Sequence, residues 1–141
     1  MSDRLLRVTL GLLAFAGAAV SASLVWARGT GAELACSTGG CEAVQSSAYA
    51  ELLGVPVAAL GLVAYLLVGA SALGAGTVAR AVGAWVALGA LLFAGYLLVI
   101  QLAVLEAVCD WCLASDSITG LLAAVSLLRL RGGLAREAGA T

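Results

Sequence analysis

The chain has 141 residues, of which 63% are hydrophobic and only 11% are charged. Soluble domains carry about 25% charged residues, so this composition indicates an integral membrane protein that forms one domain. The formal net charge of -1, without a long basic tract, excludes an electrostatic basis for nucleic-acid binding, and the lack of His argues against imidazole-based chemistry.

Four apolar segments, each close to the roughly 20 residues that a membrane-spanning helix needs, follow one another along the chain. We predict spans at residues 5–27, 55–73, 81–105 and 113–130. Pro56 falls in the first turn of the second span, where its missing N–H costs little. Residues 131–141 are expected to form a frayed tail. The predicted fold is an all-α four-transmembrane-helix bundle, one domain over residues 1–141.

Small residues recur in every span, and in lipid they allow helix backbones to approach closely. Close helix packing is therefore expected at Gly11, Gly17, Gly61, Gly69, Gly83, Gly89 and Gly95.

The arginines indicate how the bundle is oriented, because basic residues favour the cytoplasmic side. With the N-terminus inside, four spans place six of the seven arginines in the cytoplasm and only Arg28 outside. This topology predicts a multi-pass protein of a bacterial inner membrane, with both termini cytoplasmic. The first segment could instead be a cleaved signal peptide, but it is long for one and ends in the interfacial residues Trp26 and Arg28.

The four cysteines form two pairs that this topology brings to the same, extracytoplasmic side, where disulfides persist. Cys109 and Cys112 form a Cys-x-x-Cys motif before the fourth span, a known redox spacing whose thiolate a helix N-terminus stabilises. Because the span is predicted to start at Leu113, Cys112 is the better candidate for that thiolate. Asp110 would oppose the effect by like charge.

Cys36 and Cys41 form the second pair, in a polar loop with two glycines that could close a disulfide. The residues that follow, 42–53, have amphipathic helical character and are predicted to lie on the membrane as a lid over the bundle.

Three other roles remain open for the cysteines. They could staple a non-enzymatic membrane scaffold with two static disulfides, form a four-thiolate zinc site, or relay soft metal ions in a transporter. Redox exchange is favoured because the oxidising side promotes disulfides and no cysteine lies within a span, and no metal site is expected.

The motifs around these cysteines resemble the vitamin K epoxide reductase family in its bacterial form. The matching residues are Cys41-Glu-Ala-Val44-Gln-Ser46-Ser47-Ala-Tyr49, then Gly54-Val-Pro56, Gly61, Tyr65 and the final Cys109-Asp-Trp-Cys112. The resemblance covers about residues 5–130. The other four-helix disulfide oxidase family, the DsbB type, carries its two pairs in the reverse order.

The resemblance implies a mechanism. Cys112 would pass electrons to a quinone, ubiquinone or menaquinone, held in the outer half of the bundle. Cys109 would exchange with Cys41, and Cys36 with a thioredoxin-like (DsbA-like) extracytoplasmic protein. Relatives can carry that partner as a fused domain; since this sequence ends at Thr141, a separate partner is expected.

The candidate quinone-binding residues are partly departures from the family. Animal relatives that reduce vitamin K epoxide have an Asn and a Tyr where this chain has Val57 and Asp116, which favours quinone over epoxide reduction. Asp116 is the one ionisable residue clearly inside a span; it could relay a proton, or it could hydrogen-bond backbone groups at the helix start. The remaining candidates are Cys112, Trp111, Ser46 and Tyr65.

Overall fold

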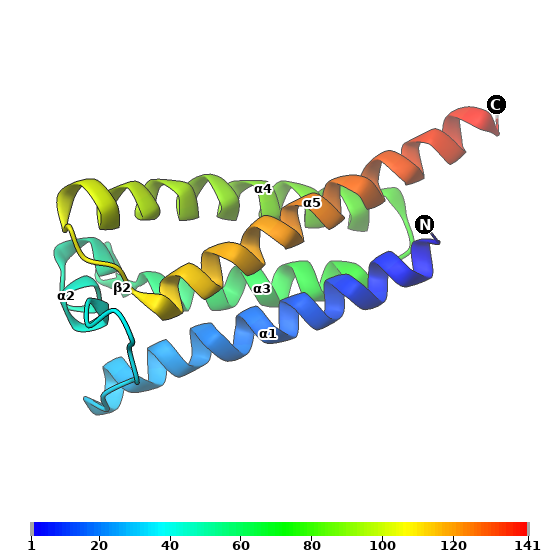
Figure 1. Cartoon of the computed structure of the whole chain (residues 1–141). Helices are drawn as coiled ribbons and strands as arrows, with labels where there is room; N and C mark the ends of the chain where they lie inside the picture. The colour runs from blue at the N-terminus through cyan, green and yellow to red at the C-terminus, as the bar shows by residue number, and fades with distance from the viewer. Residues whose placement is uncertain (1, 141) are drawn as a thin grey trace.

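The computed structural model describes residues 2–140, and most of them lie in four long helices that run side by side (Figure 1). Helix α1 spans Asp3–Thr30, α3 Val57–Leu73, α4 Thr77–Val99 and α5 Asp110–Gly139. One turn of π-helix, η2 (Ile100–Val104), continues α4. Both termini lie at one end of the bundle, which we name the termini end. All four cysteines lie at the opposite end, the cysteine end.

Three of these helices are long and apolar enough to cross a membrane: α1, α4 with η2, and α5. Helix α3 has 17 residues and is apolar but shorter. The predicted spans 5–27 and 113–130 therefore lie on long apolar helices, and 81–105 ends one residue past η2. The predicted span 55–73 begins two residues before the shorter helix. The chain is an all-α membrane protein apart from one small hairpin.

The helix ends differ from the prediction because hydropathy marks where apolar residues begin, whereas caps mark where a helix begins. Helix α5 starts at Asp110 instead of Leu113, and it continues to Gly139, so the predicted frayed tail from Arg131 is wrong. Pro56 immediately precedes α3 and is its N-cap residue.

The predicted lid helix over residues 42–53 is also wrong, because three short elements take its place. These are α2 (Cys41–Gln45), the 3₁₀ turn η1 (Ala48–Ala50) and a hairpin of β1 (Glu51–Leu52) with β2 (Val55–Pro56). The break falls at Ser47, whose hydroxyl donates to the Val44 carbonyl at 2.7 Å, so this side chain competes with continuation of the helix.

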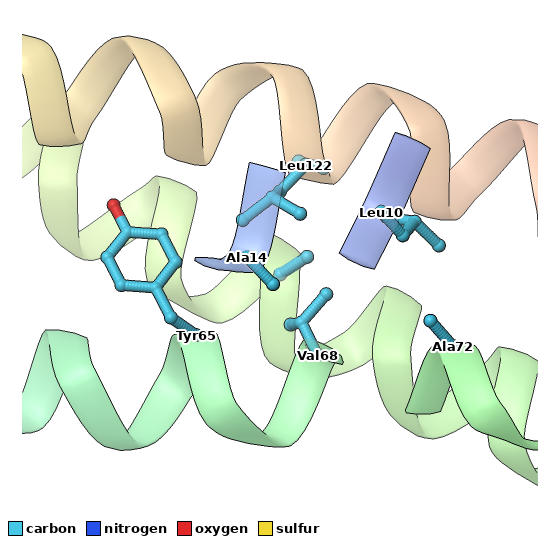
Figure 2. Packing of buried hydrophobic residues seen from close by; sticks show 8 residues of the cluster. Leu10, Ala14, Tyr65, Val68, Ala72 and Leu122 are labelled. Carbon is cyan, nitrogen blue, oxygen red and sulfur yellow. The ribbon is translucent and has the colours of Figure 1, made fainter. Parts of the chain in front are cut away.

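The core lies between α1, α3, α4 and α5 and depends on small residues (Figure 2). Leu10, Val68 and Leu122 are almost fully buried there. A Cβ added at Gly17 would lie 2.3 Å from the Tyr65 ring, and one at Gly83 would lie 2.3 Å from the Ser71 hydroxyl. These two glycines allow the close approach that was predicted. The prediction is wrong for Gly11, Gly89 and Gly95, because a Cβ added at any of them would meet no atom of a neighbouring helix within 4 Å.

At the termini end, arginines from neighbouring helices donate hydrogen bonds to carbonyl oxygens at the end of α3. Arg7 donates to Ala72 O at 2.6 Å, and the buried Arg129 donates to Ser71 O at 2.9 Å and to Gly74 O. Asp3 accepts from Arg129 at 3.4 Å. Helix ends leave such carbonyls without partners, so these side chains close α3 where no left-handed glycine does.

Candidate redox site

The loop pair, Cys36 and Cys41, forms a disulfide in this structure. Cys36 lies in the segment between α1 and α2 and is partly exposed, whereas Cys41 is the first residue of α2 and is buried. Gly39 adopts a φ of 73°, which a side chain would disfavour, and Gly40 packs directly on the Val108 backbone. The two glycines thus allow the loop to close and to lie against the segment before α5.

The second pair opens α5, and here Cys109, not Cys112, caps the helix. The Cys109 sulfur accepts the Cys112 backbone N–H at 3.3 Å, and Cys109 is fully buried. The expectation that Cys112 would be the thiolate stabilised by the helix end is therefore wrong, because α5 begins three residues earlier than predicted. The hydrogen bond from the Cys112 thiol, with backbone N–H groups of the helix start, outweighs burial and lowers the pKa of Cys109 to about 7.

Both sulfurs of this pair face the amide of Gln45. Its Nε2 lies 3.5 Å from the Cys112 sulfur and 3.9 Å from the Cys109 sulfur. Arg28 fixes the end of α2 from the other side, donating to the Gln45 carbonyl and to the Glu51 carboxylate, each at 2.5 Å. Arg28 thus holds the backbone of Gln45, whose amide is a donor that stabilises negative charge on sulfur.

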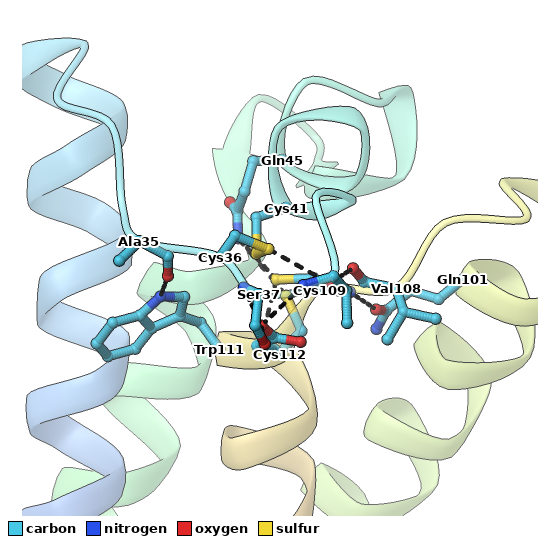
Figure 3. The surroundings of a disulfide bond; sticks show 12 residues. Ala35, Cys36, Ser37, Cys41, Gln45, Gln101, Val108, Cys109, Trp111 and Cys112 are labelled. Atoms are coloured by element: carbon cyan, nitrogen blue, oxygen red, sulfur yellow. Dashed lines mark hydrogen bonds between the residues drawn. A yellow bond between two sulfur atoms is a disulfide. The ribbon is translucent and has the colours of Figure 1, made fainter.

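The two cysteine pairs meet in one cluster (Figure 3). Cys41, Val44 and Cys109 form its buried centre, and Cys36 and Cys112 pack at its edge. Gln101 helps to place Cys109, because its Oε1 accepts the Cys109 N–H at 3.0 Å from the π-helical turn η2. With one pair as a disulfide and the other as thiols, the cluster has the components that thiol–disulfide exchange requires.

A cavity of about 430 Å³ lies below this cluster and is largely apolar. Cys112 lines it, as do Val57, Tyr65 and Asp116 among the predicted quinone-binding residues. The Asp116 Oδ2 atom is buried and has no hydrogen-bond partner among residues 2–140. An unpaired buried carboxylate oxygen is costly, so a cavity that presents one is suited to a polar group on a bound molecule.

Two predicted residues are not in the lining of that cavity. Ser46 is exposed and ends α2, with its N–H donating to the Glu42 carbonyl at 2.9 Å. The Trp111 indole donates to Ala35 O at 2.9 Å, so its ring faces the loop beside Cys36. Trp111 points away from the cavity because it is adjacent to Cys112 in the sequence, and adjacent residues lie on different faces of a helix. Cys112 and Asp116, which are four residues apart, share the face that lines the cavity.

Sequence reasoning predicted Tyr65 and Asp116 in the cavity lining but missed Gln45, Ser115 and Thr119. Gln45 contacts Cys112 across 67 positions, which no local spacing reveals, and Gln101 contacts Cys109 across eight. The Tyr65 hydroxyl lies 2.7–2.8 Å from hydroxyls of Ser115 and Thr119, which follow Cys112 on the next turns of α5. Their spacing along one helix face is the signal that could have identified them.

Comparison with known protein families bears on the same arrangement. The model of the vitamin K epoxide reductase family matches residues 8–127, which include both cysteine pairs and most of the apolar helices. A match over this much of the chain makes it a membrane protein of a thiol oxidoreductase family. The chain belongs to the vitamin K epoxide reductase family.

Proposed function

We propose that the protein is a quinone-reducing thiol oxidase that forms disulfides in a thioredoxin-like (DsbA-like) extracytoplasmic partner. One observation carries this proposal: the two cysteine pairs meet in a single cluster, and Cys112 of the second pair lines an apolar cavity. A static scaffold has no need of a thiol pair beside a cavity of this size.

The cavity residues fit a quinone. The lining is mostly aliphatic and aromatic, as the ring and isoprenoid tail of a quinone require, and its few polar groups include Gln45, which lies 3.5 Å from the Cys112 sulfur. Gln101, Ser115 and Asp116 are the groups that would hold ring oxygens, with Val57 and Tyr65 lining the apolar walls. A bound quinone supplies an acceptor for two electrons and two protons.

The difference in burial between Cys36 and Cys41 supports a direction for the electron path. The partly exposed Cys36 is the sulfur that a partner thiolate can reach. Its attack forms a mixed disulfide with Cys36 and releases Cys41 as a thiolate, and the partner's second thiol then displaces Cys36, which oxidises the partner. The released Cys41 thiolate attacks Cys109 of an oxidised Cys109–Cys112 pair, and Cys112 leaves as a thiolate. Cys36 then attacks Cys41, which restores the loop disulfide and leaves Cys109 and Cys112 reduced. That final redox state is the one in this structure.

Asp116 is proposed to provide a proton path for the same reaction. Its buried, unpartnered oxygen lines the cavity one helical turn below Cys112. The alternative, that its carboxylate caps the α5 backbone, has no support, because Asp116 lies well inside α5 and its Oδ2 accepts no bond from residues 2–140.

We further propose that α3 is the fourth span and that the cysteine end faces the periplasm. Within residues 2–140, Arg7, Arg80 and Arg129 gather at the termini end, and Arg28 is the one arginine at the cysteine end. This distribution supports a cytoplasmic location for the termini end in a bacterial inner membrane. The loop disulfide is then on the oxidising side.

The test is quinone reduction by the purified protein with a reduced thioredoxin-like periplasmic protein as donor, using ubiquinone and menaquinone analogues. We expect turnover in the wild type and none in Cys112→Ala. Absence of turnover in the wild type with both analogues would overturn the proposal. Disulfides that resist mild reductant would then favour the scaffold, and metal retained on purification would favour the metal-ion transporter.

A further inference from the structure

Asp110, between the two cysteines of the second pair, makes an unusual set of contacts. Its Oδ2 atom accepts the Ser37 N–H at 2.7 Å, the Ser37 hydroxyl at 2.6 Å and the Thr38 N–H at 3.3 Å. Ser37 and Thr38 lie inside the six-residue ring that the Cys36–Cys41 disulfide closes. One carboxylate next to Cys109 therefore holds the disulfide ring of the other pair.

The loop has little else to hold it in place. Residues 32–40 form no helix or strand, and within residues 2–140 no backbone–backbone hydrogen bond ties residues 33–39 to another part of the fold. Its other anchors are the Thr38 hydroxyl on Val108 O at 2.6 Å and the Trp111 indole on Ala35 O at 2.9 Å. Of the groups that accept these bonds, only the Asp110 carboxylate is charged, and hydrogen bonds to charged groups are the stronger ones.

The position of the Asp110 carboxylate matters for the exchange between the two cysteine pairs. Cys109 is fully buried in the cluster with Cys41 and Val44. Thiol–disulfide exchange between the pairs requires the Cys41 sulfur to stay within reach of the Cys109 sulfur. We propose that Asp110 is a positioning residue whose carboxylate clamps the Cys36–Cys41 ring over Cys109 and so sets the rate of exchange between the two pairs. The kinetic part of this inference rests on the proposed function; the clamp itself does not.

The first experiment therefore needs no turnover. Iodoacetamide alkylation of Cys109 is followed by peptide mass spectrometry in protein whose loop disulfide is intact. In Asp110→Ala the loop should lift, and Cys109 should react about ten- to a hundred-fold faster, which corresponds to the loss of hydrogen bonds to a charged acceptor. Asp110→Asn, which keeps one acceptor oxygen, should fall between. Glu33→Gln, an exposed acid of the same loop, is the matched control and should match the wild type.

The second experiment separates exchange from later chemistry. Turnover driven by the protein donor should fall by about ten-fold or more in Asp110→Ala. Turnover driven by dithiothreitol in a background without the loop cysteines (Cys36→Ser, Cys41→Ser) needs no exchange between the pairs, so Asp110→Ala should not lower it. Unchanged Cys109 alkylation in Asp110→Ala, or an equal loss with both donors, would overturn the clamp. Failure of the wild type to reduce quinone would instead overturn the proposed function, and alkylation would still decide the clamp.

Discussion

The two ends of the bundle both bury polar side chains, but they use them differently. At the termini end, Arg7 and Arg129 donate to α3 carbonyls, and Asp3 balances part of the charge. At the cysteine end, Gln45 points at two thiols and Asp116 leaves an oxygen unpaired at a cavity. Polar groups whose hydrogen bonds are made within the fold indicate a structural role, and polar groups that face reactive atoms or a cavity indicate a chemical role.

The largest expected effect in a test of this comparison is a loss of stability on replacing Arg129, whose side chain is 1% exposed. Arg129→Ala leaves the Ser71 and Gly74 carbonyls unpaired, so we expect a loss of about 3 kcal/mol in the free energy of unfolding. Turnover per folded molecule should not change. The measurement is unfolding in mixed detergent micelles, followed by tryptophan fluorescence. The exposed Arg136→Ala is the control, and equal stability of the two variants would contradict the structural role.

A smaller effect, on the rate alone, is expected at the opposite end. Asp116→Asn keeps the size of the side chain but removes its capacity to carry a proton, so quinone turnover should slow several-fold. Oxidation of the partner by the loop disulfide in a single turnover should be unaffected. Ser117→Ala, one residue along but bonded to the Leu113 carbonyl, is the matched control. Unchanged quinone turnover in Asp116→Asn would end the proton-path proposal.

The smallest effect sharpens the role of the amide beside the thiols. With the pKa of Cys109 lowered to about 7, its alkylation rate should rise with pH to half its maximum near pH 7 rather than near 9. Gln45→Leu removes one donor to the thiolate, so the thiolate becomes less favourable and the pKa should rise, moving the midpoint to higher pH by less than about one unit. The exposed neighbour variant Ser46→Ala should leave the midpoint in place. A midpoint that stays or falls in Gln45→Leu would show that the amide does not stabilise the thiolate.

Much of the fold follows from the sequence because apolar length and arginine placement are local signals. The segments 5–27 and 81–105 lie on α1 and on α4 with η2, and Cys36, Cys41, Cys109 and Cys112 gather at one end. The start of α5 at Asp110 could not be found from hydropathy, because its first residue is charged and its cap is a sulfur.

The polar details of the site depend on contacts that only folding creates. Gln45 reaches Cys112 across 67 positions, and Asp110 reaches Ser37 across 73. Asp110 seemed from its neighbours to oppose thiolate formation, yet its carboxylate is engaged by the loop. Such roles follow from the packing of α2 and the loop on α5, which residue spacing alone does not encode.

The central claim is that electrons pass between the pairs through Cys41 and Cys109, and a trapped intermediate tests it most directly. In Cys36→Ala, Cys112→Ala protein, neither resolving sulfur is present, so mild oxidation should yield a Cys41–Cys109 disulfide that peptide mass spectrometry identifies. Its formation in high yield is the predicted result. Protein in which Cys41 and Cys109 remain unlinked, while Cys36→Ala, Cys109→Ala protein links Cys41 to Cys112, would contradict the account.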